Sequence, residues 1–155
     1  MGIIKANATD NEILTAITKM SKAYWGFPED VLKEWSHLLT ITQDYIEKNN
    51  VYKLVHDDQI IGCYSYFPTS EHTVKLDNIF ILLKFIGQGL GRILMSDFLE
   101  KVEESGINKI NLDAEPNAEE FYKLFGFKTI GRVESSIKER FLPIMELKIE
   151  KNNNS

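Results

Sequence analysis

The sequence is poor in cysteine and has no surplus of basic residues. Its one cysteine, Cys63, excludes an internal disulfide and leaves no thiol pair for a zinc or redox site. Cys63 lies in an apolar strand pattern over residues 60–67, which favours a buried, inert thiol. Lys and Arg number 18 against 23 Asp and Glu, so the net charge is -5. Since nucleic-acid binding needs clustered cations, this balance argues against a nucleic-acid partner and favours a cationic one.

Long apolar runs and linker-like segments are also missing. The longest purely apolar run, residues 79–83, is too short to cross a bilayer, and no charged segment followed by an apolar stretch opens the chain. We therefore expect a soluble, cytoplasmic protein without a membrane partner. No Pro-, Gly- or Ser-rich segment interrupts the 155 residues, which predicts a single domain over residues 1–149 and a polar tail over 150–155.

What is present is an alternation of helical and strand-like patterns. The predicted strands are residues 3–6, 51–56, 59–67, 74–83, 109–114, 128–133 and 141–149. The predicted helices begin near Asp10, Glu29, Gln88 and Glu119. Strands 74–83 and 109–114 flank a crossover helix, so they should lie parallel, whereas the shorter connections predict antiparallel pairs. The predicted fold is a mixed, mostly antiparallel α/β (α+β) sheet of about six to seven strands with helices on both faces.

A glycine-rich loop lies between the predicted strand 74–83 and the helix that follows. It reads IGQGLGR over residues 86–92. The unpaired N–H groups and the dipole at a helix start favour an anion. Three glycines at alternate positions remove side chains that would hold a phosphate away from the backbone, and Arg92 adds a positive charge. The loop therefore predicts a phosphate or pyrophosphate site.

Three other interpretations of this loop follow from the same residues. A turn that only lets helix and strand pack closely stays open. A P-loop is excluded because no Lys followed by Ser or Thr closes the motif. In favour of a dinucleotide-binding fold, Asp113 stands at a strand end where that fold keeps its ribose-binding acid. Against it, Arg92 or Leu94 stands where the third glycine is needed, and an antiparallel meander precedes the loop.

The loop and a second segment together resemble the GCN5-related N-acetyltransferase (GNAT) superfamily. Residues 89–91 match the G-x-G of its cofactor loop, although Ile86 stands where Arg or Gln is usual. Residues 116–118 (PNA) followed by 121–127 (FYKLFGF) look like its second cofactor segment, in the matching order and spacing. The resemblance implies a GNAT-like sheet in which a splayed parallel strand pair holds acetyl-CoA, with no metal.

The resemblance also implies which residues contact the acetyl donor. Tyr122 matches the usual general acid, which protonates the departing thiolate, while a core aromatic ring is the alternative. The expected acetyl-CoA contacts are Phe80, Ile81, Gly87, Gln88, Gly89, Leu90, Gly91, Arg92, Asn117 and Tyr122.

The acceptor side is expected to use a base and an aromatic wall. Because an amine must lose its proton before it attacks a thioester, Asp77 is the candidate base, and Glu71 and His72 are its rivals. By resemblance, the expected acceptor contacts are Tyr24, Trp25 and Phe27.

These interpretations predict an acetyl-CoA-dependent N-acetyltransferase in which a primary amine attacks directly within a ternary complex. The expected partner is a small-molecule amine or an amine of a peptide or protein, and a homodimer is common for such folds. The alternative is a non-catalytic acyl-CoA-binding or sensing module of the same fold.

Overall fold

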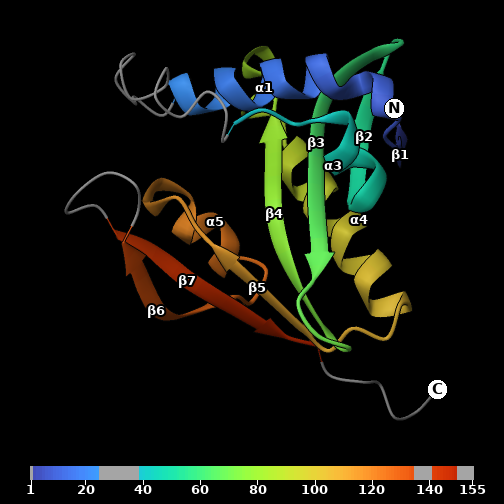
Figure 1. Ribbon diagram of the computed structural model, residues 1–155. Helices are drawn as coiled ribbons and strands as arrows, with labels where there is room; N and C mark the ends of the chain where they lie inside the picture. Colours follow the sequence, from blue (N-terminus) through green and yellow to red (C-terminus); the bar gives the residue numbers. More distant parts are fainter. Residues whose placement is uncertain (1, 25–38, 135–140, 150–155) are drawn as a thin grey trace. The chain divides into compact units, whose positions relative to one another are not determined.

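The computed structural model describes residues 2–24, 39–134 and 141–149 (Figure 1). Within these residues seven strands form one sheet in the order β1-β2-β3-β4-β5-β7-β6. The strands are β1 (Gly2–Lys5), β2 (Asn50–His56), β3 (Gln59–Pro68), β4 (Thr73–Ile81), β5 (Lys109–Asp113), β6 (Lys128–Glu134) and β7 (Phe141–Lys148). The helices are α1 (Asn11–Tyr24), α3 (Gln43–Lys48), α4 (Leu90–Glu104) and α5 (Glu119–Lys123), with short 3-10 turns η1 (Ala8–Asp10), η2 (Leu83–Phe85) and η3 (Pro116–Ala118).

The strand pairing confirms the predicted mixed sheet. The pairs β1–β2, β2–β3, β5–β7 and β6–β7 are antiparallel, whereas β4 and β5 are parallel. The parallel register joins Thr73–Lys75 to Lys109–Asn111, and β4 then continues to Ile81 without further pairing to β5 among the described residues. The parallel pairing is therefore limited to three residue pairs at the start of β4.

The turn between β2 and β3 is set by two aspartates. Asp57 and Asp58 have φ of 50° and 62°, in the left-handed region. Asp is among the non-glycine residues that enter this region most readily, and two such residues make the tight turn that matches strand twist. The antiparallel pairing predicted for strands 51–56 and 59–67, which are joined by a short connection, is thus confirmed.

The start of the crossover helix differs from the prediction. The helix begins at Leu90 rather than at Gln88. Gly87 and Gly89 have φ of 88° and 78°, which a right-handed helix does not allow, so the chain becomes helical only after the second of them. Similarly, Asp10 closes the 3-10 turn η1 before α1 begins at Asn11. The helix predicted near Glu29 lies outside the described residues.

The chain packs as two compact units. Unit 1 comprises Met1–Tyr66 and Asn78–Glu100, and unit 2 comprises Phe67–Asp77 and Lys101–Ser155. The boundaries fall inside β3, β4 and α4. The single domain over residues 1–149 stays a prediction. Among the described residues, no helix combines the length and apolarity that a bilayer crossing requires.

Unit 1 has helices on both faces of its strands (Figure 1). Buried Cys63 of β3 clusters with Leu14 of α1 and Ile46 of α3. Its neighbour in β3, Tyr64, packs its ring edge-on against Phe98 of α4, with the centroids 5.6 Å apart. Since adjacent residues of a strand point to opposite faces, α1 and α3 cover one face and α4 covers the other.

Unit 2 contains β5, β6, β7 and α5. Its buried apolar side chains include Ile110 and Leu112 of β5, Met145 of β7, and Tyr122 and Phe127. Alternate residues of β5 are thus buried, as expected for a strand with one face in a core.

Candidate functional site

The glycine loop of unit 1 is shaped by backbone conformations that favour glycine. Gly87 and Gly89 lie in the left-handed region, and a Cβ built on either would meet no atom within 4 Å. Both glycines are exposed, as is Gln88 between them. The loop therefore presents bare backbone to open space in front of the start of α4.

The N–H groups of this loop are not used by the protein itself. Among the described residues, no N–H from Gly87 to Arg92 donates a hydrogen bond, and the first bond of the helix runs from Ile93 N–H to Gly89 C=O at 3.4 Å. The four first N–H groups of an α-helix have no partner within it, and together with the dipole they attract an anion.

The charge of the surrounding segment has the sign that an anion requires. No Asp or Glu occurs from Asn78 to Ser96, whereas Lys84 and Arg92 are present, although the whole chain has a net charge of -5. Arg92 is exposed and makes no ion pair within the described part of the chain. The loop can therefore hold a phosphate-type anion.

Two hydrogen bonds hold the peptide group between Ile81 and Leu82 at the end of β4, just before this loop. The Ser21 hydroxyl of α1 donates to the Ile81 carbonyl at 3.3 Å, and the N–H of Leu82 donates to the Ile61 carbonyl at 2.7 Å. β3 approaches closely at Gly62, where a Cβ would lie 2.9 Å from the Phe80 carbonyl oxygen. The position of Phe80 and Ile81 is thus fixed from both sides.

The second candidate segment belongs to unit 2 and is centred on Tyr122. This side chain is 9% exposed and packs edge-on against Phe121 and Phe127, with centroids 5.4 Å and 5.9 Å away. Burial, followed by the negative charge of Glu115, raises the pKa of Tyr122 above its ordinary value of 10.0. The phenol therefore keeps its proton at neutral pH and is a proton donor there.

The remaining predicted residues of unit 2 lie at its surface. Asn117 is exposed in η3, and Asp77 is exposed on β4. The rivals of Asp77 are exposed as well, and the His72 Nε2 lies 3.9 Å from Glu71 Oε1. Asp113 accepts a 3.0 Å hydrogen bond from Lys75.

The predicted acceptor contacts fall at the edge of the described residues. Tyr24 is the last residue of α1, whereas Trp25 and Phe27 lie outside the described residues. No group of three or more His, Cys, Asp or Glu residues suitable for a metal ion occurs in the described ranges.

Sequence reasoning missed three polar residues of unit 1. They are Ser21, which holds Ile81, and the hydrogen-bonded pair of Ser65 and Asn78, with Asn78 Nδ2 donating to Ser65 Oγ at 2.9 Å. The signal was present, since Ser65 interrupts an apolar strand and Asn78 stands directly before an apolar run. Their partners lie far away in sequence, which no local pattern reveals.

Comparison with known proteins places these features in a family. The model of the family described as "Acetyltransferase (GNAT) domain" matches residues 16–150. A curated relative, the uncharacterized N-acetyltransferase ycf52 of Gracilaria tenuistipitata var. liui, is 28% identical over 91 residues, which cover 59% of this chain. The match covers 50% of that relative, so the chain spans about half of its length.

Solved structures share the fold at low sequence identity. The PaiA N-acetyltransferase of Thermoplasma acidophilum, solved in complex with coenzyme A, matches with a TM-score of 0.78 at 16% identity, covering 95% of this chain and 98% of that one. A GCN5-related N-acetyltransferase from Rhodopseudomonas palustris matches with a TM-score of 0.80 at 15% identity, covering 96% and 95%.

Proposed function

Because the chain belongs to the acetyltransferase (GNAT) domain family, we propose that it is an N-acetyltransferase that moves an acetyl group from acetyl-CoA to a primary amine. The family predicted from the glycine loop and the second segment is the one that the chain matches. The observation that carries the proposal is the row of unused N–H groups from Gly87 to Arg92, exposed in front of α4. A pyrophosphate is an anion suited to such donors.

The donor would be held along two stretches of unit 1. The N–H groups of residues 87–92 and the side chains of Gln88 and Arg92 would bind its phosphates, without the usual Arg or Gln at Ile86. The backbone of Phe80 and Ile81, fixed by Ser21 and Gly62, would hold its pantetheine arm. In unit 2, Asn117 would contact the same arm.

A protonated amine loses one proton before it attacks and a second as the amide forms, and the departing sulfur gains one. The amine nitrogen forms a bond to the acetyl carbon as the carbon–sulfur bond breaks. Asp77 takes the proton that the amine loses before attack, solvent takes the second, and Tyr122 gives its phenolic proton to the departing sulfur. The raised pKa of Tyr122 suits this role because the phenol remains protonated until the carbon–sulfur bond breaks. Solvent then restores the proton to Tyr122.

Calorimetry and a thiol-release assay test this proposal. We expect acetyl-CoA to bind at micromolar concentration, and we expect free CoA thiol to appear with at least one amine of a panel of spermidine, an aminoglycoside, amino acids, an alanine-initiated peptide and a lysine peptide. Absence of binding would overturn the proposal. Binding without transfer to any amine would favour the non-catalytic acyl-CoA-binding or sensing module.

A matched pair of glycine variants tests the loop. Gly89→Ala and Gly106→Ala each place a side chain at a positive φ, 78° and 79°, where a Cβ meets no atom within 4 Å. Both variants should therefore lose similar stability. Gly89→Ala should also weaken acetyl-CoA binding about tenfold, because its Cβ holds the phosphate away from the N–H donors. Equal affinity in the two variants would contradict phosphate binding at this loop.

A further inference from the structure

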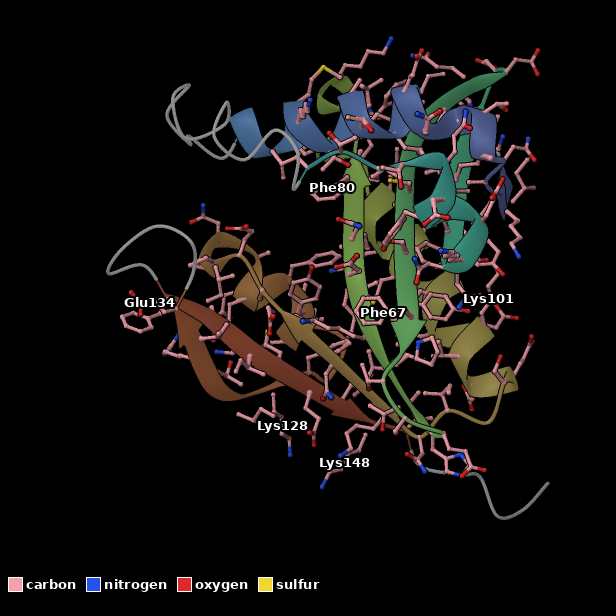
Figure 2. All side chains as sticks on the ribbon, viewed as in Figure 1. Phe67, Phe80, Lys101, Lys128, Glu134 and Lys148 are labelled. Atoms are coloured by element: carbon pink, nitrogen blue, oxygen red, sulfur yellow. The ribbon has the colours of Figure 1, made fainter. Side chains whose placement is uncertain are left out.

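A pocket of unit 1 lies beside α1, the helix that crosses one end of β3 and β4 (Figure 2). Its volume is about 640 Å³. Small-molecule sites have volumes of about 300–1,000 Å³. The lining residues come from η1, α1, the first three strands and the segment after β4, and they are Ile4, Asp10, Ile13, Ala16, Ile17, Met20, Lys53, Val55, Asp58, Gln59, Ile60 and Leu82. None of them is a residue that the proposed function assigns to acetyl-CoA, so the pocket is distinct from the proposed donor site.

The walls of this pocket hold exposed apolar side chains. Among the described residues of unit 1, five large apolar side chains are exposed, and three of these five line the pocket. They are Ile4 of β1 and Ile13 and Met20 of α1, with exposed fractions of 54%, 51% and 39%. Apolar surface that gathers around a pocket is unfavourable in water and is typical of ligand-binding grooves. The walls therefore favour a ligand with an apolar body.

The polar part of the pocket is an ion pair between η1 and β2. Lys53 Nζ donates to Asp10 Oδ2 at 2.7 Å, and the backbone N–H of Asn7 donates to the same oxygen at 2.8 Å. Lys53 is 8% exposed, so its ammonium group is largely removed from bulk water. Its remaining hydrogen-bonding capacity must therefore be met inside the pocket.

This ion pair leaves both a donor and an acceptor unused. A lysine ammonium has three N–H donors, and Asp10 is its one partner among the described residues. Both donors to Asp10 bind Oδ2, so Oδ1 accepts no hydrogen bond within the described part of the chain. Asp10 Oδ1 is not fully buried either, so a ligand can reach it. A ligand group that both accepts and donates would satisfy the two residues together.

We propose that this pocket binds a small neutral molecule with an aliphatic body and a hydroxyl or carboxamide head. The head accepts from Lys53 Nζ and donates to Asp10 Oδ1, while the aliphatic body contacts Ile13 and Met20. A carboxylate head would meet the like charge of Asp10, and an ammonium head would meet that of Lys53, whereas a neutral head avoids both. This site does not depend on acetyl transfer, so its test stands apart from that of the proposed function.

Methyl NMR of labelled isoleucines, without acetyl-CoA, tests the proposal with hexanol, hexanamide, hexanoate and hexylammonium. These probes share an aliphatic chain and differ in the head. Hexanol and hexanamide should shift the methyl signals of Ile4 and Ile13 saturably, with dissociation constants about fivefold lower than those of the charged probes. Because exposed Asp58 also lines the pocket, hexylammonium is the more demanding of the two charged controls. Ile93, which is 44% exposed on α4 and outside the pocket, should not shift.

Three results of this titration would overturn the proposal. The first is that neither neutral probe shifts Ile4 and Ile13. The second is that Ile93 shifts as much as they do, which would mean general binding to exposed apolar surface. The third is that a charged probe binds more tightly than hexanol and hexanamide.

Two variants separate the apolar walls from the polar pair. Ala16→Leu narrows the pocket from an exposed position of α1 and should weaken hexanol binding about tenfold, whereas Ser96→Leu adds a leucine at an exposed position of α4 and should leave it unchanged. Leucine is a good helix former, so both variants should fold. Lys53→Met keeps an unbranched side chain without its donors and should weaken hexanol binding about fivefold. Unchanged affinity in Ala16→Leu, or in a folded Lys53→Met, would contradict the proposal.

Discussion

Two buried tyrosines, one in each unit, differ in what their hydroxyl groups contact. Tyr64 of β3 is fully buried against α4, and its hydroxyl donates to Asp97 Oδ2 at 2.6 Å. Tyr122 of α5 is 9% exposed, and its hydroxyl has no hydrogen-bond partner among the described residues. Among the described residues, Asn111 Oδ1 is the only fully buried side-chain polar atom that lacks a hydrogen-bond partner. Because the Tyr122 hydroxyl also lacks a partner, it is not fully buried and keeps some contact with solvent.

The comparison shows that burial alone does not distinguish a structural tyrosine from a proton donor. Burial raises the pKa of both phenols above 10.0, with the Asp97 hydrogen bond adding to the effect at Tyr64 and the charge of Glu115 at Tyr122. The proton of Tyr64 is committed to a carboxylate, whereas that of Tyr122 is available to a ligand. Of the two interpretations of Tyr122, this contrast favours the general acid over the core ring.

Tyr122→Phe should have the largest effect on catalysis. Removal of a general acid costs about a hundredfold or more in rate, so kcat with the best panel amine should fall by at least that factor. The melting temperature should change little, because the hydroxyl makes no hydrogen bond within the described protein and the ring contacts with Phe121 and Phe127 persist. Steady-state kinetics and calorimetric melting measure both quantities. An unchanged kcat would return Tyr122 to the role of a core ring.

Tyr64→Phe should show the opposite result. Loss of a hydrogen bond to a carboxylate should lower the free energy of unfolding by about 1–2 kcal/mol, measured by urea denaturation, with kcat of the folded protein preserved. Asp97→Asn keeps an acceptor for the Tyr64 hydroxyl and should cost less. If Tyr64→Phe left stability unchanged and lowered kcat, the contrast between the two tyrosines would be wrong.

The parts of the fold that were predictable are those set by local chemistry. The glycines at 87 and 89 mark left-handed positions, the aspartates at 57 and 58 mark a tight turn, and alternation marks β5. Each signal lies within a few residues because backbone conformation and strand period are local properties. The mixed sheet and the start of α4 followed from such signals, with an error of two residues at the helix start, whereas the family came from the resemblance of residues 89–91 and 116–127 to its two cofactor segments.

The parts that were not predictable depend on distant contacts. Ser21 and Ile81 are 60 residues apart, and Tyr45 and Ser65 are 20 apart. The hydrogen-bond partner of a serine in an apolar strand cannot be predicted from the local sequence, because it depends on which elements pack against the strand. For the same reason the sequence could not separate Tyr122 from a core aromatic, since the surroundings of its hydroxyl depend on the tertiary structure.

The smallest expected effect is on the pH dependence of stability, to which both tyrosines should contribute in the same direction. A phenol with a raised pKa in the folded state contributes stability that is present below its unfolded pKa of about 10 and is lost as pH rises above that value. The free energy of unfolding should therefore fall above pH 10.

The stability difference between the unmodified protein and Tyr64→Phe should narrow by up to about 1 kcal/mol between pH 10 and 11, from the linkage slope of one proton. The free energy of unfolding of Tyr122→Phe should fall less above pH 10 than that of the unmodified protein, because burial raises the pKa of Tyr122 as it raises that of Tyr64. Urea denaturation at pH 8, 10 and 11 measures this, and a stability difference between the unmodified protein and Tyr64→Phe that widens above pH 10 would contradict the raised pKa of Tyr64. If stability responds alike in the two variants while only Tyr122→Phe loses turnover, the difference between the tyrosines resides in the hydroxyl partner and not in burial.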